Sequence, residues 1–438
     1  MSSRLLELAK LFLKLGTIGF GGPAAHYAFM EEEAVNRRGW LTRQHFLDLI
    51  GATNLIPGPN STEIAMHIGH HRAGMLGLVV AGVSFILPAV IVTTIFAWAY
   101  VTFGKVDAVA PFLFGVKPAV VAIIFTAGWR LGRKAITSWR LAVLCLAAAF
   151  GSLTGFGQIR SLLVISFVGL MWLVWTSGNR RQQENDPDDG PDDPPTKPND
   201  EHGSKTGMLG GAIAFTAASA SKPAHAANLP VLLAATAGTA ATLSLWKLGL
   251  FFLQVGAVLY GTGYVLVAYL EGGLVDQMGW LTRDQLYEAI AIGNFTPGPI
   301  LSTATFIGYV LFGQSGDVTG GIAGAVVASV AIFLPSFFFV AALGPIIPKL
   351  RRNRWAAAFL DAVNAASIGL IVAVTIKLCV DLFLMRVGEP QTLTVNWPSL
   401  LIAVFAAAIL IRFKPTPAWM VLFGAVAGWL ISFAVPVV

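Results

Sequence analysis

The chain has 438 residues, of which 55% are hydrophobic and 12% are charged. Soluble domains carry roughly 25% charged residues, so this composition excludes an ordinary soluble protein and indicates an integral membrane protein. Apolar runs of about 20 residues, long enough to cross a bilayer as a helix, recur along the chain. The short alternating segments of a β-barrel are absent from the sequence. We therefore expect an all-α, polytopic fold in the lipid bilayer.

The formal net charge is +6, and it is unevenly distributed. Residues 182–206 contain eight acids and two bases, which leaves 27 bases and 15 acids elsewhere, a surplus of +12. In a membrane protein such a surplus mostly records orientation, so no nucleic acid partner is expected. The only cysteines, Cys145 and Cys379, lie in apolar runs and form no disulfide framework or metal-ligand spacing. No cofactor or metal site is expected.

Predicted spans follow the apolar runs in two sets. The first set is 5–29, 74–102, 108–129, 138–153 and 159–177, with an interrupted segment at 43–70. The second set is 246–270, 317–345, 356–382, 397–412 and 417–436, with an interrupted segment at 283–310. The total is ten to thirteen, depending on whether the interrupted segments cross the bilayer or re-enter, and the sequence leaves this open.

Each interrupted segment contains Pro-Gly-Pro, at 57–59 and again at 297–299. Proline removes a backbone donor and clashes with the preceding turn, so both segments must be broken helices. In lipid, a broken helix is tolerated only where protein or a water-filled cavity satisfies the freed backbone groups. Two matched breaks in two halves are typical of a transporter binding site.

The halves are an internal duplication. Residues 11–59 align without a gap with residues 251–299, and 17 of these 49 positions are identical, including the whole of GWLTR at 39–43 and 279–283. The similarity returns at a displacement of 247 residues, as FLFGVKPA (112–119) against FLDAVNAA (359–366). We therefore expect four regions: a first repeat (1–177), an acidic linker (178–206), an Ala/Gly-rich segment that could add a span (207–243) and a second repeat (244–438).

Positive charges predict opposite orientations for the repeats. His70, His71 and Arg72 form a basic loop in the first repeat, whereas the equivalent loop at 311–317 has no base. The next loop of the second repeat instead carries Lys349, Arg351, Arg352 and Arg354. The bias has moved to the neighbouring loop, so the sequence predicts an inverted-topology pair with a cytoplasmic linker.

The breaks are the expected anion site. A half-helix that begins after a break presents backbone donors and the positive end of its dipole. Glu63 then has two interpretations: a capping box with Asn60, or a proton-coupling carboxylate at membrane depth. The second repeat has Thr303 in its place. The predicted substrate-binding residues at the breaks are Asn54, Pro57, Gly58, Pro59, Asn60, Ser61, Asn294, Thr296, Pro297, Gly298, Pro299 and Ser302.

Three further features could carry chemistry. Gly21-Gly22-Pro23 predicts a second discontinuity near the first break, and Gly21 and Gly22 are further predicted substrate-binding residues. His26 follows as a substrate or proton group or as a buried structural histidine. Lys117 lies mid-span and is the expected cation for balancing an anion. His67 and His71, spaced i, i+4, could suit a metal but read better as an interfacial cap.

These segments resemble the chromate ion transporter family in its long, two-domain form. The resemblance rests on GTIGFGGPAAH (16–26), EEEAVNRRGW (31–40), ATNLIPGPNSTE (52–63), HIGHHRAG (67–74) and GNFTPGPILSTATFIGY (293–309). It implies a bacterial inner-membrane protein that exports chromate and confers chromate resistance, with sulfate as a competitor. One departure is Thr262, where the family commonly has the middle residue of three glycines.

Other functions stay open at this stage. A sulfate or related oxyanion importer could use the same scaffold, and a homodimer is also open. An intramembrane enzyme using His26 and Glu63 lacks a nucleophile, and we expect no enzymatic activity. No Walker loop or HExxH motif occurs, so transport would use an ion or proton gradient.

Overall fold

The computed structural model describes residues 2–20, 22–104, 109–183, 243–261, 263–314, 316–343, 353–387 and 392–433. One compact unit contains both Met1–Ser177 and Thr242–Val438, and Gly178–Ala241 forms the other. Gly21, Thr262, the segment 207–242 and the linker from residue 184 lie outside the described residues.

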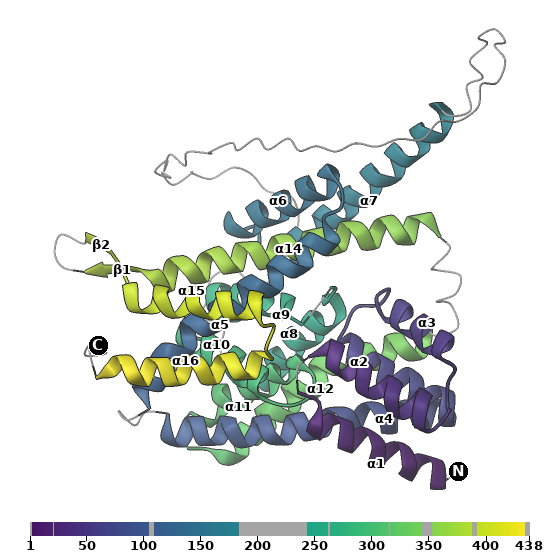
Figure 1. The fold of residues 1–438 in the computed structure, drawn as a ribbon, viewed down its shortest axis with the longest axis horizontal. Helices are drawn as coiled ribbons and strands as arrows, with labels where there is room; N and C mark the ends of the chain where they lie inside the picture. Colours follow the sequence, from purple (N-terminus) through teal and green to yellow (C-terminus); the bar gives the residue numbers. More distant parts are fainter. Residues whose placement is uncertain are drawn as a thin grey trace, which may run out of the picture. The chain divides into compact units, whose positions relative to one another are not determined.

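The first repeat forms these elements: α1 (Ser2–Ile18), α2 (Pro23–Met30), the π-helix η1 (Glu31–Arg37), α3 (Arg43–Thr53), α4 (Asn60–Phe103), α5 (Ala110–Ala135), α6 (Trp139–Leu153) and α7 (Gln158–Gln183) (Figure 1).

The second repeat repeats this order: α8 (Leu245–Val258), α9 (Val265–Leu270), the π-helix η2 (Glu271–Gln277), α10 (Arg283–Phe295), the 3-10 turn η3 (Ile300–Ser302), α11 (Thr303–Gly313), α12 (Val318–Leu343), α14 (Arg354–Phe383), α15 (Trp397–Arg412) and α16 (Pro417–Ser432). A short antiparallel hairpin, β1 (Leu384–Val387) and β2 (Thr392–Val395), joins α14 to α15.

The fold is that of an all-α polytopic membrane protein, as expected. Within the described residues, five helices are long and apolar enough to cross a membrane, in α4, α5, α7, α12 and α14. The predicted span 5–29 is not one helix, because α1 ends at Ile18 and α2 begins at Pro23 after a left-handed Gly22 (φ 80°). That interruption is the discontinuity expected from Gly-Gly-Pro.

Both Pro-Gly-Pro segments break their helices. At the first break α3 ends at Thr53 and α4 begins at Asn60, with Gly58 at φ 143° between two prolines. At the second break α10 ends at Phe295, and a 3-10 turn precedes α11. α4 also bends at Ala73 and Gly74, where φ and ψ leave the helical range. Its first part therefore corresponds to α11 and its second part to α12.

The two breaks are joined by a crossed pair of backbone hydrogen bonds. Gly58 donates its N–H to the carbonyl oxygen of Leu259 at 2.8 Å, and Gly298 donates to that of Gly19 at 2.9 Å. The donors are 240 residues apart in the sequence, and so are the acceptors. Each break is thus bonded to the end of the other repeat's first helix, and a pseudo-two-fold relates the two.

The repeats are inverted. Tyr100 lies 26 residues after the bend at Gly74, about 39 Å further along α4 at the usual helical rise. Its ring lies 5.3 Å from that of Phe306 in α11. The half-helix after the second break therefore runs toward the far end of α4, whereas the half-helix after the first break ends at the bend. The two half-helices point in opposite directions.

Close helix packing depends on glycine at symmetry-related positions. A Cβ atom on Gly16 would lie 2.5 Å from the carbonyl oxygen of Phe85, and one on Gly256 would meet the carbonyl oxygen of Ile332. In lipid, helices associate by such close approach because burial of apolar surface gives little driving force. Gly16 and Gly256 are therefore packing residues.

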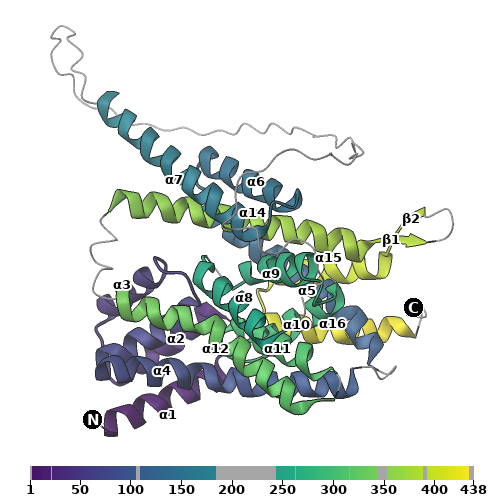
Figure 2. The same cartoon turned by 180° about the vertical axis from the view of Figure 1, so that it is seen from behind.

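The two broken helices are packed differently. Leu286 and Tyr287 of α10 belong to the largest buried cluster, together with Leu370 and Leu378 of α14. Phe46 of α3 belongs instead to a separate cluster with residues of α1 and α4. Figures 1 and 2 show α3 beside α2, away from α15 and α16, while α10 lies among the central helices. The helix before the second break is therefore embedded in the main core, whereas the helix before the first break belongs to a smaller one.

Candidate anion site at the first break

A cavity of about 350 Å³ lies against the first break. The break contributes Asn54, Ile56 and Asn60, α5 and the residues after it contribute Lys134 and Thr137, and α14 contributes Asp361, Asn364 and Ser367. Gly261 lies opposite, in the loop before α9. Polar side chains from both repeats therefore line one space together with apolar ones such as Leu131 and Ile371, and Asp361 adds a single acid to it.

The two asparagines of the break are held by each other. Asn60 donates through Nδ2 to Oδ1 of Asn54 at 2.8 Å, and Asn54 donates to the carbonyl oxygen of Ile50 at 3.0 Å. Asn60 does not cap α4, because Pro59 occupies the N-cap position and the cap has no side-chain hydrogen bond. The capping-box interpretation of Asn60 and Glu63 is therefore wrong. Ser61 is buried immediately behind them.

Several backbone donors expected to be free for an anion are already used. The N–H groups of Thr62 and Glu63 donate to the carbonyl oxygen of Pro59, at 2.8 and 3.1 Å. Gly58 and Gly298 donate across to the other repeat, and Ser302 donates to Pro299 at 3.0 Å. The polar groups that face the cavity are consequently side chains rather than the backbone of these residues.

Glu63 is fully buried beside the first break. Neither carboxylate oxygen meets a donor at bonding geometry, although the Ser336 hydroxyl lies beside it. A Cβ atom on Gly58 would collide with Oε1 of Glu63 and Oγ of Ser336, so both side chains lie against the Gly58 backbone. Within the described part of the chain, no basic side chain pairs with Glu63. A charged carboxylate at membrane depth costs about 2.5–3.5 kcal/mol, which makes this group a functional candidate.

The second break lacks this pair. Thr303 stands at the position of Glu63 and donates to the carbonyl oxygen of Ile300 at 2.8 Å. Ala89 stands at the position of Ser336, because a Cβ atom on Gly298 would lie 2.9 Å from its methyl group. Thr296 faces Thr93 at 3.4 Å. The second break is therefore satisfied by local hydroxyl contacts and carries no titratable group at these positions.

Asn294, the counterpart of Asn54, is also occupied. Tyr264 donates its hydroxyl to Oδ1 of Asn294 at 3.3 Å, and Asn294 donates to the carbonyl oxygen of Ile290 at 2.8 Å. The position of Tyr264 is Ala24 in the first repeat. The smaller residue leaves room beside the first break where a tyrosine fills the space beside the second.

His26 connects the first discontinuity with the second break. Its Nε2 lies 2.8 Å from the carbonyl oxygen of Gly19, the same oxygen that accepts from Gly298. A carbonyl can only accept, so Nε2 carries a proton and donates it. Nδ1 is buried without a partner, and the ring packs edge-on against Phe85. Gly22 is the N-cap residue of α2. It does not line the cavity, so the prediction that it binds the substrate there is not supported.

The expected cation, Lys117, lies elsewhere. Its Nζ pairs with Oδ1 of Asp284 at 2.6 Å, at the start of α10. That point is thirteen residues before Pro297, about 20 Å along a helix. The basic residue that lines the cavity is Lys134. Its charge alone did not distinguish it from its neighbour Arg133, which is also in the last turn of α5. Its aligned position in the second repeat is Asp381, and this exchange of charge was the available signal.

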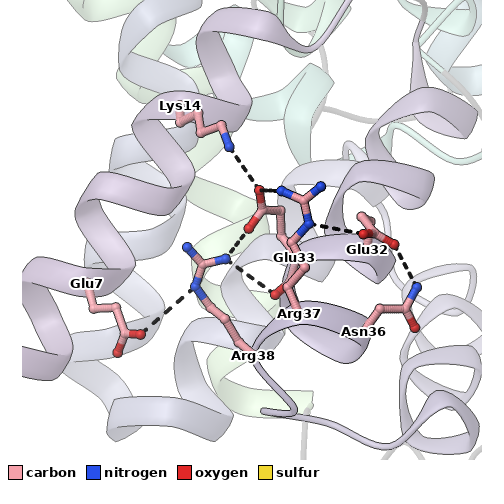
Figure 3. Close-up of polar contacts among 7 residues, drawn as sticks. All are labelled: Glu7, Lys14, Glu32, Glu33, Asn36, Arg37 and Arg38. Carbon is pink, nitrogen blue, oxygen red and sulfur yellow. Dashed lines mark hydrogen bonds and ion pairs between the residues drawn. The ribbon is translucent and has the colours of Figure 1, made fainter.

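A network of basic and acidic side chains joins α1 to η1 and Arg38 (Figure 3). Glu33 accepts from Lys14 at 2.9 Å and from Arg37 at 3.4 Å, and it also pairs with Arg38. Because Lys14 and Arg38 donate hydrogen bonds to this carboxylate, the pKa of Glu33 is lowered from its ordinary value. Lys14 is thereby a pairing residue of α1.

His67 and His71 do not gather further ligands. Among the described residues, no group of three or more His, Cys, Asp or Glu side chains is placed to hold a metal ion. His71 instead packs against the ring of His45 at 5.2 Å.

A buried carboxylate and a polar cavity at matched helix breaks of an inverted repeat are typical of secondary transporters. The chain belongs to the chromate transporter family. The model of this family, described as "Chromate transporter", matches residues 6–173 and 246–429. The two matched regions are the two repeats, and the family suggested by the sequence motifs is confirmed.

Two similar proteins cover almost the whole chain, and a shorter one covers about a third of it. A chromate transport protein of Cupriavidus metallidurans is 29% identical over 98% of this chain and 93% of its own length. A chromate transport protein of Pseudomonas aeruginosa is 29% identical over 97% of this chain and 92% of its own length. An uncharacterised transporter of Bacillus subtilis is 24% identical over 37% of this chain but 92% of its own length. No solved structure matches this chain.

Proposed function

We propose that this protein is a secondary active transporter that exports chromate across the bacterial inner membrane and thereby gives chromate resistance. The observation that carries this proposal is the polar cavity at the first break, in a chain whose full-length relatives are named chromate transport proteins. Chromate is a tetrahedral dianion, and the amides of Asn54 and Asn60 with the ammonium of Lys134 suit such an anion. Sulfate has the same shape and charge and should compete.

Glu63 is proposed as the proton-coupling group. It lies one helical turn after the cavity residue Asn60, but its own side chain is fully buried and does not line the cavity. No described cation pairs with it to balance a negative charge. A carboxylate in that setting avoids the cost of an unpaired charge by carrying a proton. His26, with its unpaired Nδ1, is the second candidate for moving a proton between the two breaks.

The basic residues near the cavity indicate the direction of transport. The cavity is lined by the C-terminal end of α5, where Arg130, Arg133 and Lys134 are clustered. Under the positive-inside rule this end is cytoplasmic, so the described conformation would receive its anion from the cytoplasm. Import or exchange of sulfate on the same scaffold is the competing function.

Chromate uptake into everted vesicles tests the proposal. We expect uptake by wild-type vesicles that depends on an imposed proton gradient and falls when excess sulfate is present. Glu63→Gln should remove the dependence on the gradient, whereas Glu32→Gln changes an exposed acid and serves as the matched control. Sulfate accumulation in right-side-out vesicles without chromate uptake in everted ones would assign the importer function instead.

A further inference from the structure

Five charged or polar positions recur at corresponding places in the two repeats. Two of them precede the broken helix, one begins it, and two lie at the end of the long helix behind it. In the first repeat they are Glu31, Asn36, Arg43, Arg130 and Lys134, and in the second Glu271, Asp276, Arg283, Lys377 and Asp381. The aligned positions differ by 240 residues before the breaks and by 247 in the long helices.

In the second repeat these positions form a closed network. Lys377 of α14 pairs with Glu271 at 3.2 Å and with Asp276 at 2.6 Å. Arg283, the first residue of α10, pairs with Asp381 of α14 at 3.1 Å. Tyr287 of α10 donates its hydroxyl to the carbonyl oxygen of Leu378 at 2.9 Å. The broken helix of the second repeat is thus fastened to the end of α14.

In the first repeat the same positions are apart. Arg43 pairs with Glu31 at 3.1 Å, which is the counterpart of the Arg283 and Glu271 contact. Arg130 instead donates to the carbonyl oxygen of Leu410 at 3.3 Å. Lys134 lines the cavity and makes no ion pair within the described ranges. Of the five first-repeat positions, only Lys134 lines the cavity, and its counterpart Asp381 is part of the closed network of the second repeat.

An inverted-repeat transporter alternates by letting its two halves exchange conformations. In the exchanged state Arg130 would meet Glu31, as Lys377 now meets Glu271. Lys134 would approach Arg43, as Asp381 now approaches Arg283. The first contact joins opposite charges, but the second brings together two cations. Closure of this end therefore requires a negative charge that the five side chains do not supply.

The net charges of the two sets of five positions show how much negative charge the first repeat lacks. The five second-repeat positions carry a net charge of −1, and the five first-repeat positions carry +2. A dianion in the cavity would neutralise this surplus and would lie where the carboxylate of Asp381 lies in the other network. A monoanion would leave one positive charge of these five positions uncompensated.

We propose that Arg43 and Lys134 together bind the transported dianion when the first-repeat end closes, while Arg130 pairs with Glu31. The anion substitutes for the missing aspartate, so this end closes only around a tetrahedral dianion. This assignment rests on the proposed transport function, and it names the residues that make binding depend on the charge of the substrate.

The test measures how fast a reporter cysteine at the cavity reacts. Thr137→Cys is placed in a background with Cys145→Ala and Cys379→Ala, and a cationic thiol reagent is added to the purified, monodisperse protein. Molybdate serves as the probe because it is a tetrahedral dianion that does not oxidise thiols. We expect molybdate to slow the reaction by about fivefold or more, the low end of usual couplings between ligand and conformation. Chloride should not slow it.

The decisive variant is Lys134→Asp, which supplies the carboxylate that the second repeat already has. We expect its reporter to react slowly without any anion, although the added negative charge should attract a cationic reagent. Lys134→Gln should stay reactive and lose the molybdate effect, and Arg133→Asp makes the same charge change at a residue that does not line the cavity. Equal reaction rates for Lys134→Asp and Lys134→Gln, or equal slowing by Arg133→Asp, would overturn the proposal.

A second measurement covers the Arg130 contact. Charge reversal in Glu31→Arg or in Arg130→Glu should each abolish the molybdate effect, and the double variant should restore it. A double variant that stays unresponsive while remaining monodisperse contradicts the pairing. Neither measurement requires chromate transport, so a failure of the reporter assay is distinguishable from a failure of the proposed function in vesicles.

Discussion

Glu63 and Ser336 lie against the same glycine, with the carboxylate from α4 and the hydroxyl from α12 both packed on Gly58. The symmetry-related glycine, Gly298, has Ala89 against it and Thr303 in place of the glutamate. The polar pair therefore belongs to one break only, and it is the break that lines the cavity.

Replacing the Glu63 carboxylate should separate stability from transport. Glu63→Gln replaces a buried carboxyl group that has no cation partner with a neutral amide of similar size, so we expect unfolding in detergent to occur at the same or a higher temperature. Transport driven by a proton gradient should fall at least tenfold, because the amide cannot exchange a proton. Thermal unfolding and vesicle uptake measure the two effects. Gradient-driven uptake at the wild-type rate would remove Glu63 from the coupling mechanism.

Gly58 should tolerate no side chain. Its φ of 143° is strained for any other residue, and a Cβ atom would collide with Glu63 and Ser336. We expect Gly58→Ala to destabilise the protein by about 3 kcal/mol, from backbone strain together with overpacking.

Gly279→Ala is the matched control, because Gly279 also has positive φ (62°) but nothing lies within 4 Å of its Cβ position. It should cost only the strain, about 1 kcal/mol. Unfolding in mixed detergent measures both variants, and equal losses would show that crowding at Gly58 contributes nothing.

The cavity lysine should control anion affinity. Lys134→Gln removes the basic side chain that lines the cavity, and we expect binding of molybdate to weaken about tenfold, equivalent to about 1.4 kcal/mol. Arg133→Gln removes a neighbouring charge that does not line the cavity and should weaken binding much less. Titration calorimetry on purified protein measures both. Equal losses would reduce the role of Lys134 to general electrostatic attraction.

The network in Figure 3 should contribute stability that depends on pH. The pKa of Glu33 is lowered in the folded protein by hydrogen bonds from Lys14 and Arg38. Its contribution is therefore complete above the unfolded value of about 4.3 and is lost as the pH falls through the lowered folded value. Glu33→Gln should unfold at a lower temperature than wild type at pH 7, and the difference should shrink toward pH 3. Glu32→Gln, at an exposed site, should show a smaller difference throughout.

The sequence was enough to predict the helix breaks and their pairing, because proline chemistry and a gapless duplication are local facts. It also predicted the inversion, from the shift of basic residues between neighbouring loops. Lys134, and not Lys117, lines the cavity, and the only signal for this in the sequence was the exchange of Lys134 for Asp381 between the repeats. The cap of α4 was misassigned because Asn60 finds a tertiary partner in Asn54.

The crossed hydrogen bonds of Gly58 and Gly298 have a consequence for ancestry. Neither repeat can satisfy its own break, since each glycine N–H needs a carbonyl oxygen from the opposite repeat. A chain with a single repeat, such as the half-length Bacillus subtilis relative, would need a second copy inserted upside down to complete both bonds. Such a pair of identical copies must carry every acid twice. In a chain that contains both repeats the two can differ, and here Glu63 occurs in the first repeat and Thr303 in the second.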